Sequence, residues 1–102
     1  MGRYISFLAL VLIMTKPILY DFHATWCGPC RIQSPIVHDI EKKMGDKVDV
    51  KMIDVDEHGD LANKYSISVV PTLIIEKDGK IIQRLEGVTD AATLESLLKP
   101  LL

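Results

Sequence analysis

The sequence is organised around Trp26-Cys27-Gly28-Pro29-Cys30, which holds the only two cysteines of the chain. A nearly continuous apolar run, Ile18–Phe22, comes before it and predicts a strand that is buried on both faces. Behind it, apolar residues recur at every fourth position, as on one helix face: Ile32, Ile36, Ile40 and Met44. The pattern therefore predicts a strand, a tight turn and a helix from about Cys27 to Met44, with the cysteines at the helix start.

Two cysteines separated by two residues, at a strand-to-helix turn, are typical of dithiol–disulfide exchange. Cys27 is the expected nucleophile, because the free N–H groups and the positive dipole end of a helix start stabilise a thiolate. Cys30 lies one turn later, where it can attack the mixed disulfide that Cys27 forms with a substrate. Two other interpretations are half of a zinc site, although the chain has no second cysteine pair, and a structural disulfide, whose short loop would stabilise little.

Size and composition favour one globular domain. The chain has 102 residues, 48% of them hydrophobic and 25% charged, with a formal net charge of −2. It contains no basic cluster, which argues against nucleic acid as its main partner.

The middle of the chain continues with a strand and a short helix. Alternating apolar residues predict a second strand from Val48 through Val55. A strand, a helix and a strand in this order imply a parallel pair with a right-handed crossover. Leu61–Tyr65 predicts a short helix with Asp60 as its N-cap.

The last third predicts a hairpin and a final helix. Pro71–Ile75 and Lys80–Glu86 predict the third and fourth strands, joined antiparallel by a tight turn at Asp78-Gly79. Gly87 ends the fourth strand, and Asp90 is the expected cap of a helix. The apolar face of that helix consists of Leu94, Leu97, Leu98 and Leu101.

Residues 1–15 form an apolar segment ahead of a domain that spans residues 16–102. Its start is basic, and Tyr4–Met14 contains only Ser6 as a polar residue, which resembles the first two parts of a secretory signal. No small-x-small cleavage site follows, and a bilayer span needs about 20 apolar residues. An additional folded element, an extension ahead of a true start at Met14, and a signal or membrane anchor all stay open.

With these elements in place, the chain resembles the thioredoxin family. The segment from Trp26 to Cys30 is identical to the active-site motif of the family, and the resemblance covers roughly residues 16–102. The other matching positions, all at the family's spacing, are Asp21, Pro35, Val70-Pro71-Thr72, Asp78-Gly79 and Gly87. The resemblance implies an α/β fold, with a central mixed sheet of four strands and helices on both faces. We expect the strands in the order Val48, Ile18, Pro71, Lys80, the last two antiparallel to the first two.

The resemblance also implies a function. The chain would reduce disulfides in other proteins and would itself be re-reduced by a thioredoxin reductase. It would need no bound cofactor and no metal, and would act as a monomer in the cytoplasm. Gly28 and Pro29 between the cysteines go with the reducing members of the family. The alternatives are a membrane-tethered, extracytoplasmic thiol oxidoreductase and a non-catalytic binding module on the same fold.

Several residues receive roles from this likeness. Asp21 on a buried strand should have a raised pKa and could accept the proton of Cys30 through water, or could simply be a hydrogen-bonded core carboxylate. Pro71 corresponds to a cis-proline that would let the Val70 backbone pair with an extended substrate. The expected substrate-binding residues are Trp26, Gly28, Pro29, Val70, Pro71 and Gly87.

The chain departs from the family pattern at two positions. His23 stands where many members have a bulky aromatic residue, and it either tunes a neighbouring thiol or only packs. Met52 stands where many members have a lysine facing the buried acid, and Lys51 points to the opposite face by strand alternation. We therefore expect Asp21 to titrate at higher pH than in members with that lysine.

Overall fold

The computed structural model describes residues 15–102, so the expectations for the apolar N-terminal segment lie almost wholly outside the described residues. The strands are β1 (Ile18–His23), β2 (Asp49–Asp54), β3 (Thr72–Lys77) and β4 (Lys80–Glu86). The helices are α2 (Gly28–Met44), α3 (Gly59–Lys64) and α4 (Ala91–Leu98), with short 3₁₀ turns at Gly45–Lys47 and Lys99–Leu101. Within residues 15–102, no helix combines the length and the apolar character needed to cross a bilayer.

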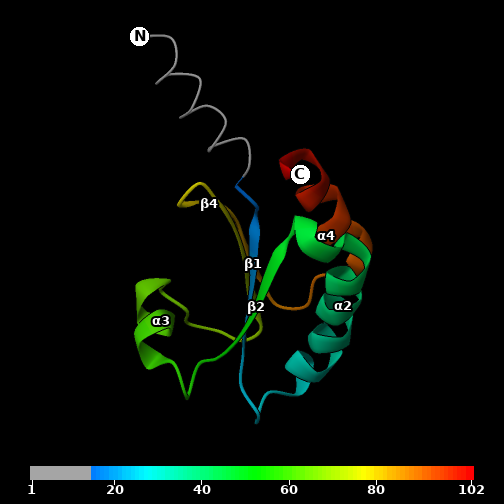
Figure 1. Cartoon of the computed structure of the whole chain (residues 1–102). Helices are drawn as coiled ribbons and strands as arrows, with labels where there is room; N and C mark the ends of the chain where they lie inside the picture. The colour runs from blue at the N-terminus through cyan, green and yellow to red at the C-terminus, as the bar shows by residue number, and fades with distance from the viewer. Residues whose placement is uncertain (1–14) are drawn as a thin grey trace, which may run out of the picture.

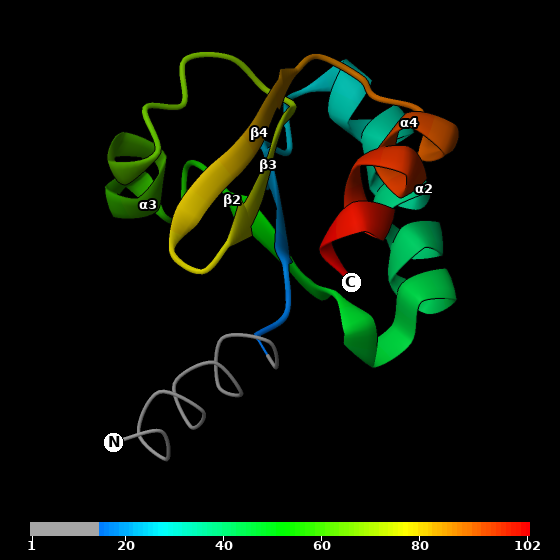
Figure 2. The same cartoon turned by 90° about the horizontal axis from the view of Figure 1, so that it is seen from above.

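The strands form one mixed sheet with helices on both faces, as expected. Figure 1 shows α3 on one face of the sheet and α2 with α4 on the other, and Figure 2 shows the same three layers from above. Because α2 and α4 cover one face and the short α3 covers only part of the other, the core of the protein lies mainly between the sheet and the helix pair.

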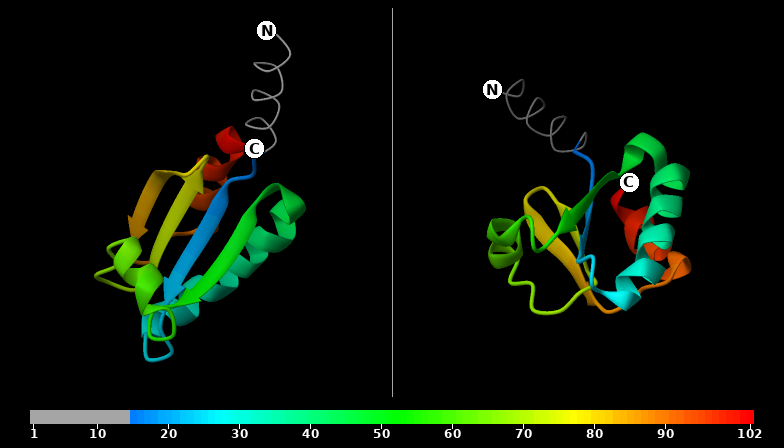
Figure 3. Two further views of the ribbon diagram at one scale, coloured as in Figure 1. Left: turned by 60° about the vertical axis from the view of Figure 1, so that its left-hand side comes forward. Right: turned by 90° about the horizontal axis from the view of Figure 1, so that it is seen from below.

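The strand order is β2-β1-β3-β4, which confirms the expected order. β1 pairs parallel with β2 and antiparallel with β3, and β4 pairs antiparallel with β3. The expectation that both β3 and β4 run against β1 and β2 is wrong for β4. Each antiparallel pairing reverses the direction once, so β4 runs the same way as β1, as the left view of Figure 3 shows.

Helix α2 begins where the sequence predicts, but its buried face is different. Cys27 is its N-cap, and its buried residues are Cys30, Gln33, Val37, Ile40 and Met44. Ile32, expected on this face, is 61% exposed. Four residues turn an α-helix by about 40° more than one full turn, so three such steps carry Ile32 about 120° away from Met44. Residues whose spacing alternates between three and four positions lie on the face that the helix actually buries.

The two remaining helices test the predicted caps. The Asp90 carboxylate accepts a hydrogen bond from the Thr93 N–H at 2.8 Å, which confirms it as the cap of α4. The prediction for Asp60 is wrong, because α3 begins at Gly59 and Asp60 lies in its first turn. His58 occupies the cap position without a side-chain hydrogen bond.

Alternate residues of β1 enter different layers of the core. Tyr20 and Phe22 pack with Tyr65, which follows α3, and Leu19 packs with residues of α2 and α4. Asp21 is on the side of Leu19, because side chains alternate along a strand. The acid therefore points into the layer that holds α2 and its two cysteines.

Candidate active site

Three segments that are distant in the sequence meet around the cysteines. Cys27 and Cys30 pack with Ala24 and with the half-buried Val55 and Val70. The Cys27 sulfur lies 3.5 Å from the carbonyl oxygen of Val70, in the loop before β3. The site therefore combines the turn after β1 with the adjoining start of α2, the residue that follows β2 and the loop that leads into β3.

The two cysteines form a disulfide, and both are 4% exposed. Their Cα atoms lie 5.3 Å apart. The backbone N–H of Cys30 donates a hydrogen bond of 3.2 Å to the Cys27 sulfur. This donor and the positive end of α2 would stabilise negative charge on the Cys27 sulfur once the disulfide is open. The arrangement can thus cycle between a disulfide and a dithiol whose first sulfur is nucleophilic.

The loop beside the cysteines contains a cis peptide bond between Val70 and Pro71, as the resemblance to the thioredoxin family implies. The Thr72 hydroxyl donates to the Val69 carbonyl at 2.7 Å, and the Gly87 N–H donates to the Pro71 carbonyl at 2.9 Å. Gly87 has a φ of +84°, a conformation that glycine adopts without steric cost. The segment after β4 is thus held against the proline loop next to the disulfide.

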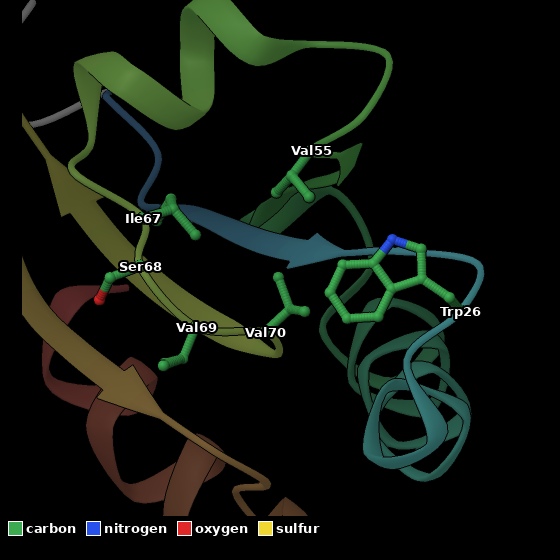
Figure 4. Close-up of a pocket in the computed structure, with 6 residues that line it drawn as sticks. All are labelled: Trp26, Val55, Ile67, Ser68, Val69 and Val70. Carbon is green, nitrogen blue, oxygen red and sulfur yellow. The ribbon is translucent and has the colours of Figure 1, made fainter.

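An apolar groove of about 150 Å³ opens beside the disulfide. Figure 4 shows the Trp26 indole on one side of it and the Val70 side chain pointing toward the indole. Trp26 is 68% exposed, and its ring N–H donates to the Asp56 carboxylate at 2.9 Å. The lining residues are Trp26, Val55, Ile67, Ser68, Val69 and Val70. Asp56 was not predicted as a site residue, since nothing in the local sequence indicates which residue orients the indole.

Gly28 and Pro29 occupy the first turn of α2 and are exposed. A side chain at Gly28 would meet no atom within 4 Å. The backbone on this side of the disulfide is therefore open to a partner chain.

Asp21 has 0% exposed surface, and among residues 15–102 neither of its carboxylate oxygens has a hydrogen-bond partner. Burial raises the pKa of Asp21 from 3.8 to about 6, and the charges of His23 and His38 partly oppose that rise. The predicted direction is confirmed. The interpretation of Asp21 as a hydrogen-bonded core carboxylate is wrong within this part of the chain.

Gln33 is a buried residue that the sequence analysis missed. Its amide nitrogen donates to the Thr89 carbonyl at 3.0 Å, and its amide oxygen accepts from the Thr89 N–H at 2.7 Å. These bonds tie α2 to the segment that follows Gly87. The available signal was its position three residues after Cys30, on the face that the helix buries.

Comparisons with known proteins agree with this architecture. The thioredoxin family model matches residues 5–100. A chloroplastic thioredoxin Y from Oryza sativa subsp. japonica is 47% identical over 78% of this chain and 47% of its own length. The thioredoxin of Bacillus subtilis is 38% identical over 79% of this chain and 78% of its own length. The X-ray structure of Fasciola hepatica thioredoxin superposes with a TM-score of 0.79 at 31% identity, covering 99% of this chain and 94% of that one.

The matches differ in how much of each relative they cover. The chain spans about half the length of the chloroplastic and mitochondrial relatives that it matches, between 47% and 52%. It spans most of the bacterial relative and of the solved structure. The matched part in every case includes a segment of at least 79 residues.

Proposed function

The chain belongs to the thioredoxin family, and on that premise we propose that it reduces disulfide bonds in other proteins by dithiol–disulfide exchange. The observation that carries the proposal is the Cys27–Cys30 pair at the start of α2, with the Cys30 N–H donating to the Cys27 sulfur. A helix start that donates to one sulfur of a closely spaced pair favours attack by that sulfur.

The first step is attack by the Cys27 thiolate on a disulfide of the target protein. A bond forms between the Cys27 sulfur and one target sulfur, the target disulfide breaks, and the other target sulfur leaves as a thiolate. The second step resolves this mixed disulfide. Cys30 loses its proton to Asp21 and attacks the Cys27 sulfur, which releases the second target thiolate. Two electrons have then passed to the target, and the protein holds the disulfide of the structure.

Asp21 fits the role of proton acceptor for two physical reasons. It points into the layer that contains Cys30, and its pKa of about 6 makes it a stronger base than an exposed carboxylate. Since its oxygens have no hydrogen-bond partner among residues 15–102, Cys30 included, the proton would pass through a bridging water rather than directly.

The groove between Trp26 and Val69 is the proposed docking surface for targets. Its apolar walls would hold side chains next to the target cysteine, and the Val70 backbone would pair with an extended target segment. The roles of Gly28, Pro29, Pro71 and Gly87 in substrate binding belong to the same proposal. Gly28 and Pro29 lie exposed between the two cysteines, and the Gly87 N–H donates to the Pro71 carbonyl in the loop beside them.

The proposed partners are disulfide-bearing proteins and a thioredoxin reductase that restores the dithiol. The two sulfurs carry the electrons, so the exchange itself requires no bound cofactor. We place the protein in the cytoplasm as a monomer. Cell fractionation with mass spectrometry of the native N-terminus tests the compartment against a membrane-tethered form, and sedimentation equilibrium tests the monomer.

Reduction of insulin disulfides tests the activity, with dithiothreitol as electron donor. Wild type should accelerate the precipitation of insulin chains, and Cys27→Ser should be inactive because the nucleophile is gone. Cys30→Ser should accumulate a mixed disulfide, visible by mass spectrometry. An inactive wild-type protein would exclude the proposal and favour a binding module, and an active Cys27→Ser variant would exclude Cys27 as the nucleophile.

A further inference from the structure

His23 is the last residue of β1, two positions beyond Asp21. Side chains alternate along a strand, so both lie on the face that packs against α2. Leu19, two positions before Asp21, confirms this face because it packs with Val37 and Ile40. Asp21 is fully buried, whereas His23 is half-buried at the end of the strand and stays in partial contact with solvent.

The neighbouring strands offer Asp21 no other cation. On β2, Met52 is aligned with Asp21 and Asp54 with His23, and on β3 Leu73 is aligned with Asp21. Lys51 is exposed, points to the other face and lies near Asp49. The ionisable side chain that these strands add to this face near the acid is Asp54, whose Oδ1 accepts the Asp56 N–H at 2.9 Å. Lys77 of β3 shares this face, but it is four residues from Leu73 and its Nζ donates to the Leu101 carbonyl.

Helix α2 contributes the cysteine pair and His38. The cysteines carry no charge while they are joined. His38 is exposed, and its Nδ1 lies 3.7 Å from the Glu41 carboxylate. Positive charge on this ring is therefore partly offset by Glu41 and screened by water. Of the cations around Asp21 in the described part of the chain, His23 opposes the effect of burial most strongly and His38 follows it.

We propose that His23 is a positioning residue for the proton step: its imidazolium supplies the positive charge that holds the buried Asp21 in its carboxylate form. The positive charge is supplied by a residue of β1 itself, the strand that contains the acid, and not by position 52 on the neighbouring strand β2. Attraction between opposite charges favours the carboxylate, so removal of the His23 charge makes Asp21 harder to ionise.

The consequence for catalysis rests on the proposed function. Asp21 must begin the second step as a carboxylate in order to take the Cys30 proton. The His23 charge keeps Asp21 ionised at lower pH, so it sets the lowest pH at which Cys30 can resolve the mixed disulfide efficiently, called here the acid limit of mixed-disulfide resolution. No bond to His23 is made or broken in this step.

The test is a carbon-13 NMR titration of the Asp21 carboxyl in the oxidised protein, where the thiols cannot titrate. Wild type, His23→Phe and His23→Lys are compared from about pH 4 to pH 9. Loss of the cation in His23→Phe should raise the Asp21 midpoint by about half a unit or more, and the permanent cation of His23→Lys should lower it. His23→Gln replaces His23→Phe if the latter fails to fold.

Two variants at other histidines serve as controls. His58→Gln changes an exposed residue at the start of α3, on the other side of the sheet, and should leave the Asp21 midpoint unchanged. His38→Gln should raise it by less than His23→Phe. If His23 acted only through packing, His23→Phe and His23→Lys would shift the Asp21 midpoint in the same direction. That result, or equal midpoints in all variants, would overturn the proposal.

A kinetic measurement separates this inference from the proposed function. In the His23→Phe variant, the acid limit of mixed-disulfide resolution should move to higher pH by the same amount as the Asp21 midpoint. Insulin reduction by the variant at alkaline pH should match wild type. Failure of wild type to reduce insulin would reject the proposed function and leave the NMR result standing, whereas an unmoved acid limit would reject the role of His23 alone.

Discussion

Asp21 combines complete burial with two carboxylate oxygens that have no hydrogen-bond partner among residues 15–102. A buried carboxylate without partners costs free energy, because the protein does not replace the water that it loses. Stability alone would select against an acid at this position. The proposed role in proton transfer accounts for an acid at this position, and it leads to predictions at the scale of single residues.

The first prediction concerns stability and pH in Asp21→Asn. The folded pKa of about 6 lies above the 3.8 of the free group, so the folded state holds the proton more tightly than the unfolded state. The contribution of Asp21 to wild-type stability is therefore complete below about pH 4 and is lost as the pH rises to about 6. The variant avoids that loss, and its stability relative to wild type should grow by about 2 to 3 kcal/mol between pH 4 and pH 8.

Urea unfolding of the oxidised proteins at a series of pH values measures this difference. The pH-independent cost of burying the asparagine amide cancels, because only the change with pH is used. A difference that stays constant across the series would show that Asp21 titrates at its ordinary pKa.

The second prediction concerns Met52, which is aligned with Asp21 across the β1–β2 pair. Met52→Lys places an ammonium group on the face of the acid, and the attraction between opposite charges should lower the pKa of Asp21 from about 6 by about one unit. The carboxyl carbon resonance of Asp21 reports it directly. Lys51→Met, on the opposite face, is the matched control and should leave the midpoint in place.

At the scale of elements, α2 serves the site through both its start and its buried face. Its first turn donates to the Cys27 sulfur, and Gln33, a turn further on, holds the segment after β4 by two hydrogen bonds to Thr89. Since Gly87 in turn donates to the Pro71 carbonyl, the helix, the proline loop and the end of β4 form one connected support.

The third prediction tests this support. Gln33→Leu keeps the volume but leaves the N–H and C=O of Thr89 without their partners, which should cost about 1 to 3 kcal/mol of unfolding free energy. Gln83→Leu, at a half-exposed position of β4, is the control and should change stability much less. Equal urea midpoints for the two variants would mean that water replaces the amide without cost.

At the scale of the whole molecule, the groove exists only because the turn after β1 and the loop before β3 meet. Trp26 comes from the first, Val69 and Val70 from the second, and Asp56 after β2 holds the indole. Exposed apolar side chains gathered at one such place are typical of a docking surface.

The fourth prediction is that the groove serves protein targets and not small disulfides. Val69→Asp puts a charge on its apolar wall, and should raise KM for insulin by about tenfold, the equivalent of one lost apolar contact, while leaving the rate with a small aromatic disulfide unchanged. Ile81→Asp on β4 is a matched control, because Val69 is 47% exposed and Ile81 is 48% exposed. An equal effect of both variants on insulin reduction would place docking elsewhere.

Local patterns predicted most of the elements. The apolar run before Cys27, the aspartate cap of α4 and the Asp78-Gly79 turn each depend on neighbours within a few residues. Asp78 and Gly79 both have positive φ, as a tight hairpin turn requires. The raised pKa of Asp21 was predictable too, because a charged residue inside an apolar strand must be desolvated.

The sequence by itself thus determined the motif, the order of the elements and the chemistry of the two sulfurs, since these depend on short-range spacing and residue type. Only the tertiary structure decided the direction of the β3–β4 hairpin relative to β1, the exposure of Ile32 and the partners of Trp26 and Gln33. The reason is physical: a strand direction, a buried helix face and a hydrogen bond across the molecule depend on residues far away in the chain. Local periodicity carries no information about which of those distant residues will arrive there.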